Sequence, residues 1–364
     1  MSENIWSVIT ATGSYIPTRI VKNEDFLNHT FYDPNGNLYD KPNSYIIEKF
    51  EEITGIKERR YVTDDLVTSD IAFFAAQNAL ESSGIDKESL DYIIVAHNFG
   101  DVRHDRRQSD FVPSIAARVK SKLEISNPYT IAYDLPFGCP GWLQGVIHAD
   151  FYIKSGKAKR ILVIGAETLS RVSDPHDRDS MIYSDGAGAA ILEGIKSEEP
   201  VGILSHSARS DTKNHAFLLW MGDSYNPALK GIQLYLKMSG QNLYKYALQN
   251  VPDLVKECID KANVTIDQIK KVFIHQANNK MDEEILKRFH KLFGIEKMTD
   301  EEIFDIMPMT ISWLGNSSVA TLPTLLDLMV KGQLSEQKVN SKDIVVFASV
   351  GAGMNINSFT YKFQ

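Results

Sequence analysis

The sequence predicts an α/β protein built from two similar halves. Continuous apolar strands alternate with helices along the chain, as is typical of parallel strands covered by helices on both faces. A unit of helix, connector and strand at 71–97 recurs at 243–275. A unit of turn, helix and strand at 137–165 recurs at 314–348. Repetition of whole units in the same order indicates a duplicated domain.

In the first repeated unit, a helix leads through a short connector with acidic residues into an apolar strand. The strand of the first half ends at His97, and its counterpart in the second half ends at His275. Runs of Ile, Val and Phe in these strands predict burial on both sheet faces. The two histidines are therefore expected at equivalent strand ends.

In the second repeated unit, a glycine-containing turn leads into a helix. The helix at 142–153 follows Cys139, and the helix at 319–330 follows Asn316. Sites in α/β proteins gather at helix N-termini and at the carboxyl ends of strands. A pseudo-twofold axis between the halves would therefore bring Cys139, His275 and Asn316 together.

Length and composition indicate an ordinary globular protein of two domains. The 364 residues are divided here into domains at 1–195 and 196–364. A net charge of -8 argues against nucleic-acid binding, because neutralising phosphates needs clustered Lys and Arg. No apolar run approaches the ~20 residues that span a membrane. With two cysteines and no signal-peptide pattern, we expect a cytoplasmic protein without a disulfide framework.

Cys139 is the candidate nucleophile. It lies between Gly138 and Gly141 at the start of a helix, where a substrate can approach the sulfur. The helix macrodipole contributes about 0.3–1 kcal/mol there, which is less than one pKa unit. Stronger activation needs a neighbouring imidazole, and His275 is the candidate. Cys258 lies on an apolar helix face and is predicted to be a core residue.

Simpler roles are open for the other two residues. His275 could be a core histidine, although polar residues follow it where the strand would leave the sheet. Asn316 could be a helix N-cap and nothing more. No group of His, Asp and Cys has a recognised zinc spacing, and the glycine-containing run at 184–190 enters a strand rather than a helix. The sequence thus predicts neither a metal nor a nucleotide cofactor.

The chain resembles the β-ketoacyl-acyl-carrier-protein synthase III family of the thiolase superfamily. The resemblance covers nearly the whole chain, and three separated catalytic motifs occur in the family's order. The matching stretches are Tyr133–Leu135, Gly138–Trp142, Asp174–Arg178, Asp185–Ala190, His275–Asn278, Gly315–Ser318 and Gly351–Gly353. The resemblance implies a thiolase fold, in which duplicated βαβαβαββ halves form αβαβα layers.

The resemblance also implies the chemistry of each motif. Cys139 would carry the acyl group, and His275 and Asn316 would hydrogen-bond the carbonyl oxygen of the second thioester. Backbone N–H groups of Cys139 and of Gly351, Ala352 and Gly353 would form an oxyanion hole. Such preorganised donors contribute about 2.7–4 kcal/mol to transition-state stabilisation. No metal or redox cofactor is needed, because the substrate is an acyl thioester of acyl carrier protein or coenzyme A.

Substrate contacts follow the family pattern only in part. Arg178 and Asn278 occupy substrate-binding positions, but Lys49 and Ile53 stand where the family has the Trp and Arg that grip adenine. Weaker binding of coenzyme A, or a carrier-protein substrate, is therefore expected. Val112 replaces a Phe that closes the acyl pocket from the partner subunit, which favours a roomier pocket.

The resemblance implies two protein partners. Lys280, Lys287 and Arg288 are expected to attract an acidic acyl carrier protein, with a solvated helix face as the alternative. A homodimer that pairs through its central sheet is also expected. The longer segment Thr30–Tyr45 could be a lid or a surface elaboration, and the stretch 298–309 is lengthened as well.

The implied activity is that of an acyltransferase of class EC 2.3.1. It would join a Cys139-bound acyl group to a malonyl or β-ketoacyl thioester by Claisen-type condensation. One alternative is the coupling and cyclisation of two β-ketoacyl units to a dialkylresorcinol-type precursor. Further alternatives are a thioesterase that uses the same cysteine and a catalytically silent partner subunit.

Overall fold

The structure is a computed structural model that describes residues 4–364. A five-stranded mixed sheet forms the core of the first half, in the order β1-β9-β8-β4-β7. Strands β7 and β8 both pair with β4 in parallel, whereas β9 is antiparallel to both β8 and β1. The strands are β1 (Asn4–Tyr15), β4 (Tyr92–His97), β7 (Ile131–Pro136), β8 (Arg160–Thr168) and β9 (Asp185–Ser197).

A four-stranded sheet forms the core of the second half, in the order β10-β15-β14-β13. Its pairings are antiparallel, antiparallel and parallel, which is the same succession as in β1-β9-β8-β4. The strands are β10 (Gly202–Ser210), β13 (Ile269–Ile274), β14 (Ile344–Gly351) and β15 (Asn355–Lys362). The predicted duplication is therefore present in the strand order.

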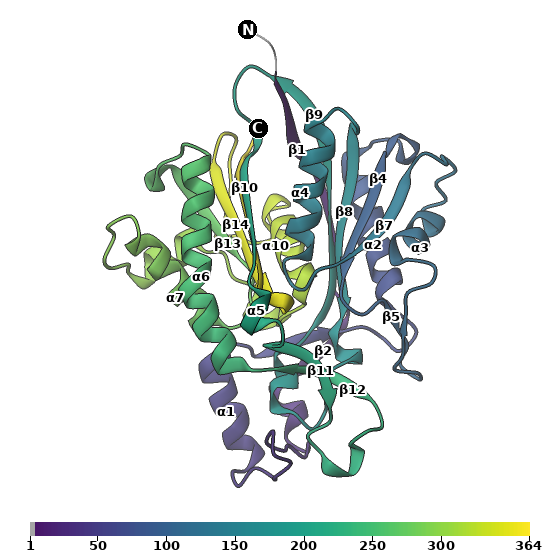
Figure 1. Cartoon of the computed structure of the whole chain (residues 1–364), viewed down its shortest axis with the longest axis vertical. Coiled ribbons are helices and arrows are strands. Elements are labelled where there is room, and N and C mark those ends of the chain that lie inside the picture. Colours follow the sequence, from purple (N-terminus) through teal and green to yellow (C-terminus); the bar gives the residue numbers. More distant parts are fainter. Residues whose placement is uncertain (1–3) are drawn as a thin grey trace.

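Helices lie outside and between the two sheets, in the layers αβαβα (Figure 1). Helices α4 and α10 occupy the middle layer, α2 and α3 cover the first sheet, and α6 and α7 cover the second. The six helices are α2 (Thr68–Ser83), α3 (Ile115–Lys122), α4 (Gly141–Lys154), α6 (Gly240–Lys261), α7 (Asn279–Lys291) and α10 (Thr321–Val330).

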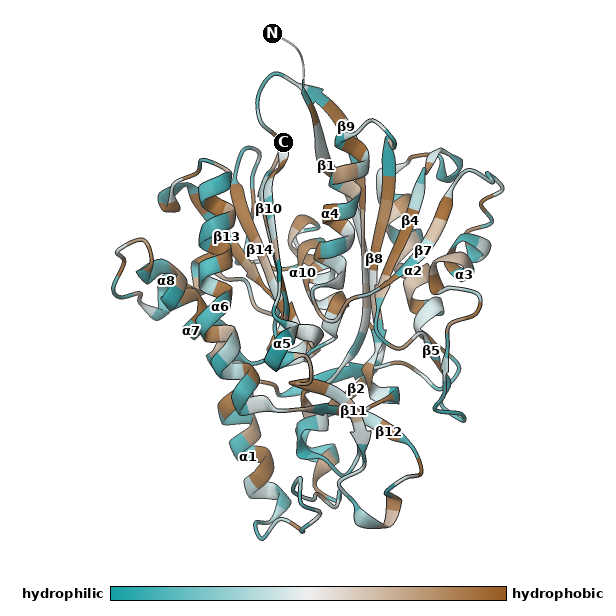
Figure 2. Cartoon of the chain, viewed as in Figure 1, coloured by the Kyte–Doolittle hydropathy of each residue, from teal (hydrophilic) through white to brown (hydrophobic). Residues whose placement is uncertain are grey.

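Burial explains why these segments form strands and central helices. Residues Ile161–Thr168 of β8 are all buried, as expected for a strand with helices on both faces. In α10 only the last residue, Val330, is exposed, whereas α7 alternates buried and polar positions. Figure 2 shows the same contrast, with largely hydrophobic strands and hydrophilic outer faces on α6 and α7.

Most of the smaller elements lie below the sheets, around one end of the central helices, whereas α8 lies beside α7 (Figures 1 and 2). The hairpin β11–β12 is separate from both main sheets. The stretch that the sequence shows as lengthened contains α8, whose Ile303 is buried in the core of the second half. These elements are α1 (Asn43–Thr54), β2 (Arg19–Lys22), β3 (Glu58–Tyr61), β5 (Asp101–Val102), β6 (Ser109–Asp110), α5 (Thr212–His215), β11 (Leu219–Asp223), β12 (Leu234–Met238), α8 (Asp300–Ile306) and α9 (Ile311–Leu314).

Two details differ from the sequence-based expectation. Alternation of strands and helices predicted parallel pairing, but β9 and β15 are antiparallel to both of their neighbours, because each returns along the sheet without a crossover helix. His275 lies one residue beyond β13, whereas His97 is the last residue of β4.

The predicted domain division after residue 195 falls near the end of β9 and stays a prediction.

Within residues 4–364, no helix is both long enough and apolar enough to cross a membrane.

Candidate active site

Cys139 lies in the short turn between β7 and α4, two residues before the helix begins. Gly138 has φ +71°, a conformation that L side chains rarely adopt. An added Cβ at Gly138 would lie 2.8 Å from the backbone nitrogen of Ala352. Glycine is therefore required at position 138 because the Cys139 turn packs directly on the turn that follows β14.

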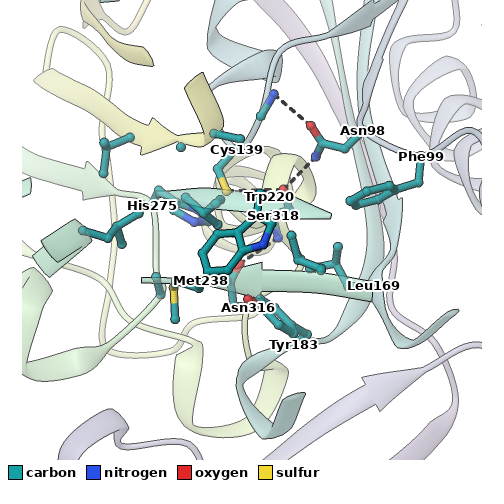
Figure 3. Close-up of a pocket in the computed structure, with 18 of the residues that line it drawn as sticks. Asn98, Phe99, Cys139, Leu169, Tyr183, Trp220, Met238, His275, Asn316 and Ser318 are labelled. Carbon is teal, nitrogen blue, oxygen red and sulfur yellow. Dashed lines mark hydrogen bonds between the residues drawn. The ribbon is translucent and has the colours of Figure 1, made fainter. Parts of the chain in front are cut away.

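A cavity of about 200 Å³ brings Cys139, His275 and Asn316 together, although they come from the two halves of the chain. Figure 3 shows the three side chains around one opening, with Trp220 across it. Most of the other lining is apolar and comes from β11, β12 and the loops after β4 and β8; it includes Phe99, Leu169, Leu219, Leu236 and Met238. An apolar wall with a few polar groups is typical of a ligand pocket.

Asn316 is fixed through its backbone and its side-chain oxygen. Its N–H donates to the carbonyl of Ile182 at 3.0 Å, and its carbonyl accepts from the N–H of Ser184 at 2.8 Å. Its Oδ1 accepts the N–H of Ser318 at 2.8 Å. Because Oδ1 is occupied, the NH₂ group of Asn316 is the part available to hydrogen-bond a ligand.

His275 is held in a neutral state. Its backbone N–H donates to the carbonyl of Ala348 at 2.9 Å, and its side chain is 3% exposed. Burial lowers the pKa of the imidazole to about 4. Among the described residues, its Nδ1 has no hydrogen-bond partner. A neutral imidazole has one donor nitrogen and one acceptor nitrogen for a substrate.

The Cys139 thiol is less acidic than the sequence predicted. Burial raises its pKa to about 11, and a hydrogen bond from Ser318 opposes the rise. The macrodipole of α4 is worth less than one pKa unit in most settings, so desolvation outweighs it. Because the pKa of His275 is also low, the two side chains are a neutral pair near pH 7 rather than a thiolate and an imidazolium.

A hydrogen-bonded chain that the sequence did not reveal reaches the sulfur of Cys139 (Figure 3). The Ser318 hydroxyl donates to the sulfur at 3.4 Å, and Asn98 Nδ2 donates to Ser318 Oγ at 3.2 Å. Asn98 Nδ2 also donates to Glu167 Oε2 at 2.6 Å. Only the position of Asn98, directly after His97 at a strand end, was a signal in the sequence.

The predicted oxyanion-hole segments lie against each other. An added Cβ at Gly351 would lie 2.5 Å from the backbone nitrogen of Cys139. Gly353 has φ +77°, which turns the chain sharply between β14 and β15. Gly138, Cys139, Gly351 and Ala352 line the cavity, so these two turns form one of its sides, whereas Gly353 does not line it.

A groove of about 910 Å³ adjoins the cavity and shares with it Met238, Leu243, Ala277, Met281 and Asn316. The predicted substrate residues Arg178 and Asn278 line this groove. The Arg178 guanidinium lies 5.1 Å from the ring centre of Tyr39. The segment Thr30–Tyr45 therefore supplies an aromatic partner for Arg178, which the sequence analysis did not predict. Asn278 also caps α7, because its side chain accepts the Met281 N–H at 3.0 Å.

Lys49 and Ile53 both line the groove. They are the residues predicted at the two positions of the family's adenine grip. Lys49 is exposed and forms an ion pair with Glu52, so its charge is partly compensated.

The other predicted contact residues lie away from the cavity. Val112 is 85% exposed and does not line the cavity of its own chain. Each predicted docking residue has a carboxylate neighbour on the surface, at 2.8–4.0 Å; the pairs are Lys280–Glu52, Lys287–Glu283 and Arg288–Glu284. The positive charge of this face is therefore partly compensated.

His97, the counterpart of His275, has a structural role. It is fully buried, its Nε2 lies 2.9 Å from Asp134, and its Nδ1 accepts the N–H of Gly100. Cys258 is fully buried in the core, as predicted. In the described part of the chain, no group of three or more His, Cys, Asp or Glu is arranged to hold a metal ion.

Duplicated halves, αβαβα layers and a cysteine at the N-terminal end of a central helix define a thiolase-fold protein. The family model described as 3-oxoacyl-(acyl-carrier-protein) synthase III matches residues 133–212, and its C-terminal model matches residues 259–363. Beta-ketoacyl-(acyl-carrier-protein) synthase III 1 of Vibrio parahaemolyticus is 31% identical over 99% of this chain and 100% of the relative. The Ehrlichia ruminantium synthase III is 32% identical over 96% of both chains.

The chain belongs to this family of synthases. Similar solved structures include the synthase III of Aquifex aeolicus, with a TM-score of 0.78 and 26% identity over 98% of this chain and 100% of the other. The priming β-ketosynthase of the R1128 polyketide pathway has a TM-score of 0.80 and 23% identity, and the match covers 100% of this chain and 98% of the other. This similarity supports the thiolase fold. The protein is a ketosynthase III-type acyltransferase that catalyses Claisen condensation. The comparisons do not favour cyclising coupling, a thioesterase or a silent subunit.

Proposed function

We propose that Cys139 carries the acyl group and that His275 and Asn316 act on the second thioester. The observation that carries this proposal is the meeting of the three side chains in one largely apolar cavity beside a groove to the surface. A cysteine nucleophile with a neighbouring imidazole is a recurring arrangement for acyl transfer. The apolar wall excludes water from the acyl-enzyme, which favours condensation over hydrolysis.

In the acylation step, the sulfur of Cys139 attacks the carbonyl carbon of the donor thioester. The new C–S bond forms first and gives a tetrahedral oxyanion. The bond to the carrier sulfur breaks when this species collapses, and the thiol proton passes through His275 to the departing sulfur. Because the pKa of Cys139 is about 11, the proton must leave during the attack rather than before it. The N–H groups of Cys139 and of the Gly351–Gly353 turn would stabilise the tetrahedral oxyanion.

In the condensation step, a malonyl-type thioester loses carbon dioxide and leaves its electron pair as an enolate. His275 and the NH₂ group of Asn316 would donate hydrogen bonds to the enolate oxygen. The enolate carbon then attacks the acyl carbonyl, the carbon–carbon bond forms, and the bond to Cys139 breaks. Each charge develops on oxygen or sulfur beside a preorganised donor, so the proposed reaction needs no metal or redox cofactor.

We propose an acyl carrier protein as the carrier, because the family descriptions and the curated relatives name it. The groove beside Arg178, Tyr39 and Asn278 is the proposed path of the thioester arm to Cys139. Lys280, Lys287 and Arg288 stay the predicted docking residues. Each of these side chains pairs with a carboxylate of this chain. Docking of the carrier protein would therefore break these surface ion pairs and replace them with contacts to the carrier. The pairing of Tyr39 with Arg178 also offers a cation and an aromatic ring to a coenzyme A nucleotide.

A homodimer is the proposed assembly. Among residues 4–364, the edge strand β7 pairs only with β4, so its other edge presents unpaired backbone groups. Exposed apolar side chains surround this edge, with Ile131 49%, Tyr129 85% and Val112 85% exposed. Pairing of two β7 strands would cover these groups and would bring Val112 of one subunit towards the other.

Intact-protein mass after incubation with acyl and malonyl thioesters on both carriers tests the proposed function. We expect wild type to gain the mass of one acyl group and Cys139→Ala to gain none. Cys258→Ala is the matched control and keeps the adduct, because Cys258 is buried away from the cavity. An adduct that persists in Cys139→Ala, or condensation that survives this change, would contradict the proposal.

A further inference from the structure

The Asn98 amide has a fixed orientation. Its Oδ1 accepts the N–H of Gly138 at 2.8 Å, and a backbone N–H can only donate. Its Nδ2 donates to Glu167 Oε2 at 2.6 Å, and the Asn98 N–H donates to the same oxygen at 2.9 Å. Exchanging the amide oxygen and nitrogen would place two donors together at Gly138 and two acceptors together at Glu167. The assignment is therefore determined by its partners.

This orientation also fixes the direction of the Ser318 hydroxyl. Asn98 Nδ2 is 3.2 Å from Ser318 Oγ and is a donor, so Oγ accepts there. The hydroxyl hydrogen of Ser318 is then free to point to Cys139 Sγ at 3.4 Å. Consequently the sulfur receives a hydrogen bond, which favours the thiolate over the thiol.

Ser318 also connects the nucleophile to Asn316. Its backbone N–H donates to Asn316 Oδ1 at 2.8 Å while its hydroxyl donates to the sulfur. Ser318 has φ +54°, in the left-handed region that a non-glycine residue seldom occupies. In this conformation one residue contacts both groups.

We propose that Ser318 stabilises the thiolate of Cys139 by direct hydrogen bonding, and that Asn98 is a positioning residue that acts through Ser318. The inference rests on the proposed role of Cys139 as the nucleophile. Glu167 holds Asn98, so the donor direction runs from Asn98 to Ser318 and on to the sulfur. The arrangement partly offsets the burial that disfavours the thiolate.

The rate of Cys139 alkylation by iodoacetamide, measured from pH 7 to pH 11, tests the role of Ser318. We expect Ser318→Ala to move the rate profile to higher pH by about one unit, a roughly tenfold lower rate at fixed pH. Ser318→Gly should give the same shift with less backbone strain, because glycine adopts positive φ freely. Ser317→Ala is the matched control, because the neighbouring Ser317 hydroxyl bonds Thr321 and does not reach the sulfur.

A double-mutant comparison tests the role of Asn98. If Asn98 acts through Ser318, Asn98→Ala slows alkylation in wild type but adds little to Ser318→Gly. Profiles of both Ser318 variants that match wild type, or fully additive effects, would overturn the inference. Alkylation requires no condensation, so a failure of the proposed function would appear as normal alkylation shifts without product. Mapping the adduct to Cys139 separates its signal from that of Cys258.

Discussion

At the residue scale, burial sets the protonation of the site in two opposite directions. It raises the pKa of the Cys139 thiol to about 11 and lowers the pKa of the His275 imidazole to about 4. Both side chains are thus neutral before substrate binds. A neutral imidazole has one N–H that can donate to an enolate oxygen and one nitrogen that can accept the thiol proton, which suits both proposed steps. The low thiolate population makes hydrogen bonds to the sulfur important.

The raised pKa of Glu167 should make the free energy of unfolding depend on pH. Burial raises the pKa of its carboxyl from 4.5 to about 7. Between these values the folded chain binds the proton more strongly than the unfolded chain, so this group's contribution to stability falls as pH rises. Glu167→Gln should remove that fall, and its free energy of unfolding should gain about 2–3 kcal/mol over wild type between pH 4 and pH 8.

Urea unfolding of both proteins at several pH values measures this gain, and Glu198→Gln at an exposed position is the control. Parallel stability curves for wild type and Glu167→Gln would contradict the prediction. The variant retains an oxygen that can accept from Asn98, so it should also retain the chain to Ser318.

Gly351 is predicted to be essential for activity. An added Cβ would lie 2.5 Å from the Cys139 nitrogen and would push the two turns apart. Separating the turns would displace the N–H groups proposed to stabilise the oxyanion. Loss of such a donor lowers the rate about 100-fold or more, so Gly351→Ala should lower kcat by at least that factor. Gly240→Ala is the control, since its nearest neighbour would be a flexible Met238 side chain at 3.7 Å. Steady-state condensation assays that show equal kcat for both variants would disprove this.

At the element scale, the hairpin β11–β12 forms the roof of the cavity and is separate from the main sheets. Its anchor is Lys237, which is 1% exposed and bonds Asp174 at 2.6 Å and Asp177 at 3.1 Å. The Lys237 ammonium also lies 3.4 Å from the ring centre of Tyr225. Its neighbours Leu236 and Met238 line the cavity, so the ion pairs hold the hairpin over the cavity.

Lys237→Met should destabilise the protein, because it leaves two buried carboxylates without their cation. Breaking a buried ion pair from one side costs about 3–5 kcal/mol, and we expect a loss of that size in the free energy of unfolding. Lys230→Met, at an exposed site in the same hairpin, should change it by less than about 0.5 kcal/mol. Denaturant midpoints measure both effects. Equal midpoints for the two variants would show that the anchor is unimportant.

At the scale of the whole molecule, duplication places one helix N-terminus from each half at the centre. The first sheet has a fifth strand, β7, that has no counterpart in the four-stranded second sheet. In the second half, α8 lies in the lengthened segment; its Ile303, and Met307 directly after the helix, pack in that half's core. The two halves therefore differ at their edges.

Ile131→Lys should weaken the proposed dimer. A charge on the exposed side of the edge strand opposes pairing with a second β7, in the way natural proteins protect free edges. Sedimentation at micromolar concentration should show wild type at twice the chain mass and the variant shifted to the monomer. Phe304→Lys, at a 54% exposed position on α8, is the control and should stay dimeric. A monomeric wild type would contradict the assembly.

The sequence by itself determined the duplicated α/β fold and the three residues that meet in the cavity. Strand patterns and turn glycines are local signals, and repetition made positions in one half equivalent to positions in the other. The turn at Cys139 and the strand end at His275 were therefore predictable without coordinates. Family resemblance added chemical roles to residues that spacing had already singled out.

Only the tertiary structure decided the electrostatics of the site and its surrounding contacts. The pKa of Cys139 depends on how many groups exclude water from it, and that number comes from segments far apart in the sequence. Likewise, Asn98 reaches Ser318 across a separation of 220 residues, and Tyr39 reaches Arg178 across the groove. Such contacts have no local pattern, because folding alone brings their residues within hydrogen-bond or van der Waals distance.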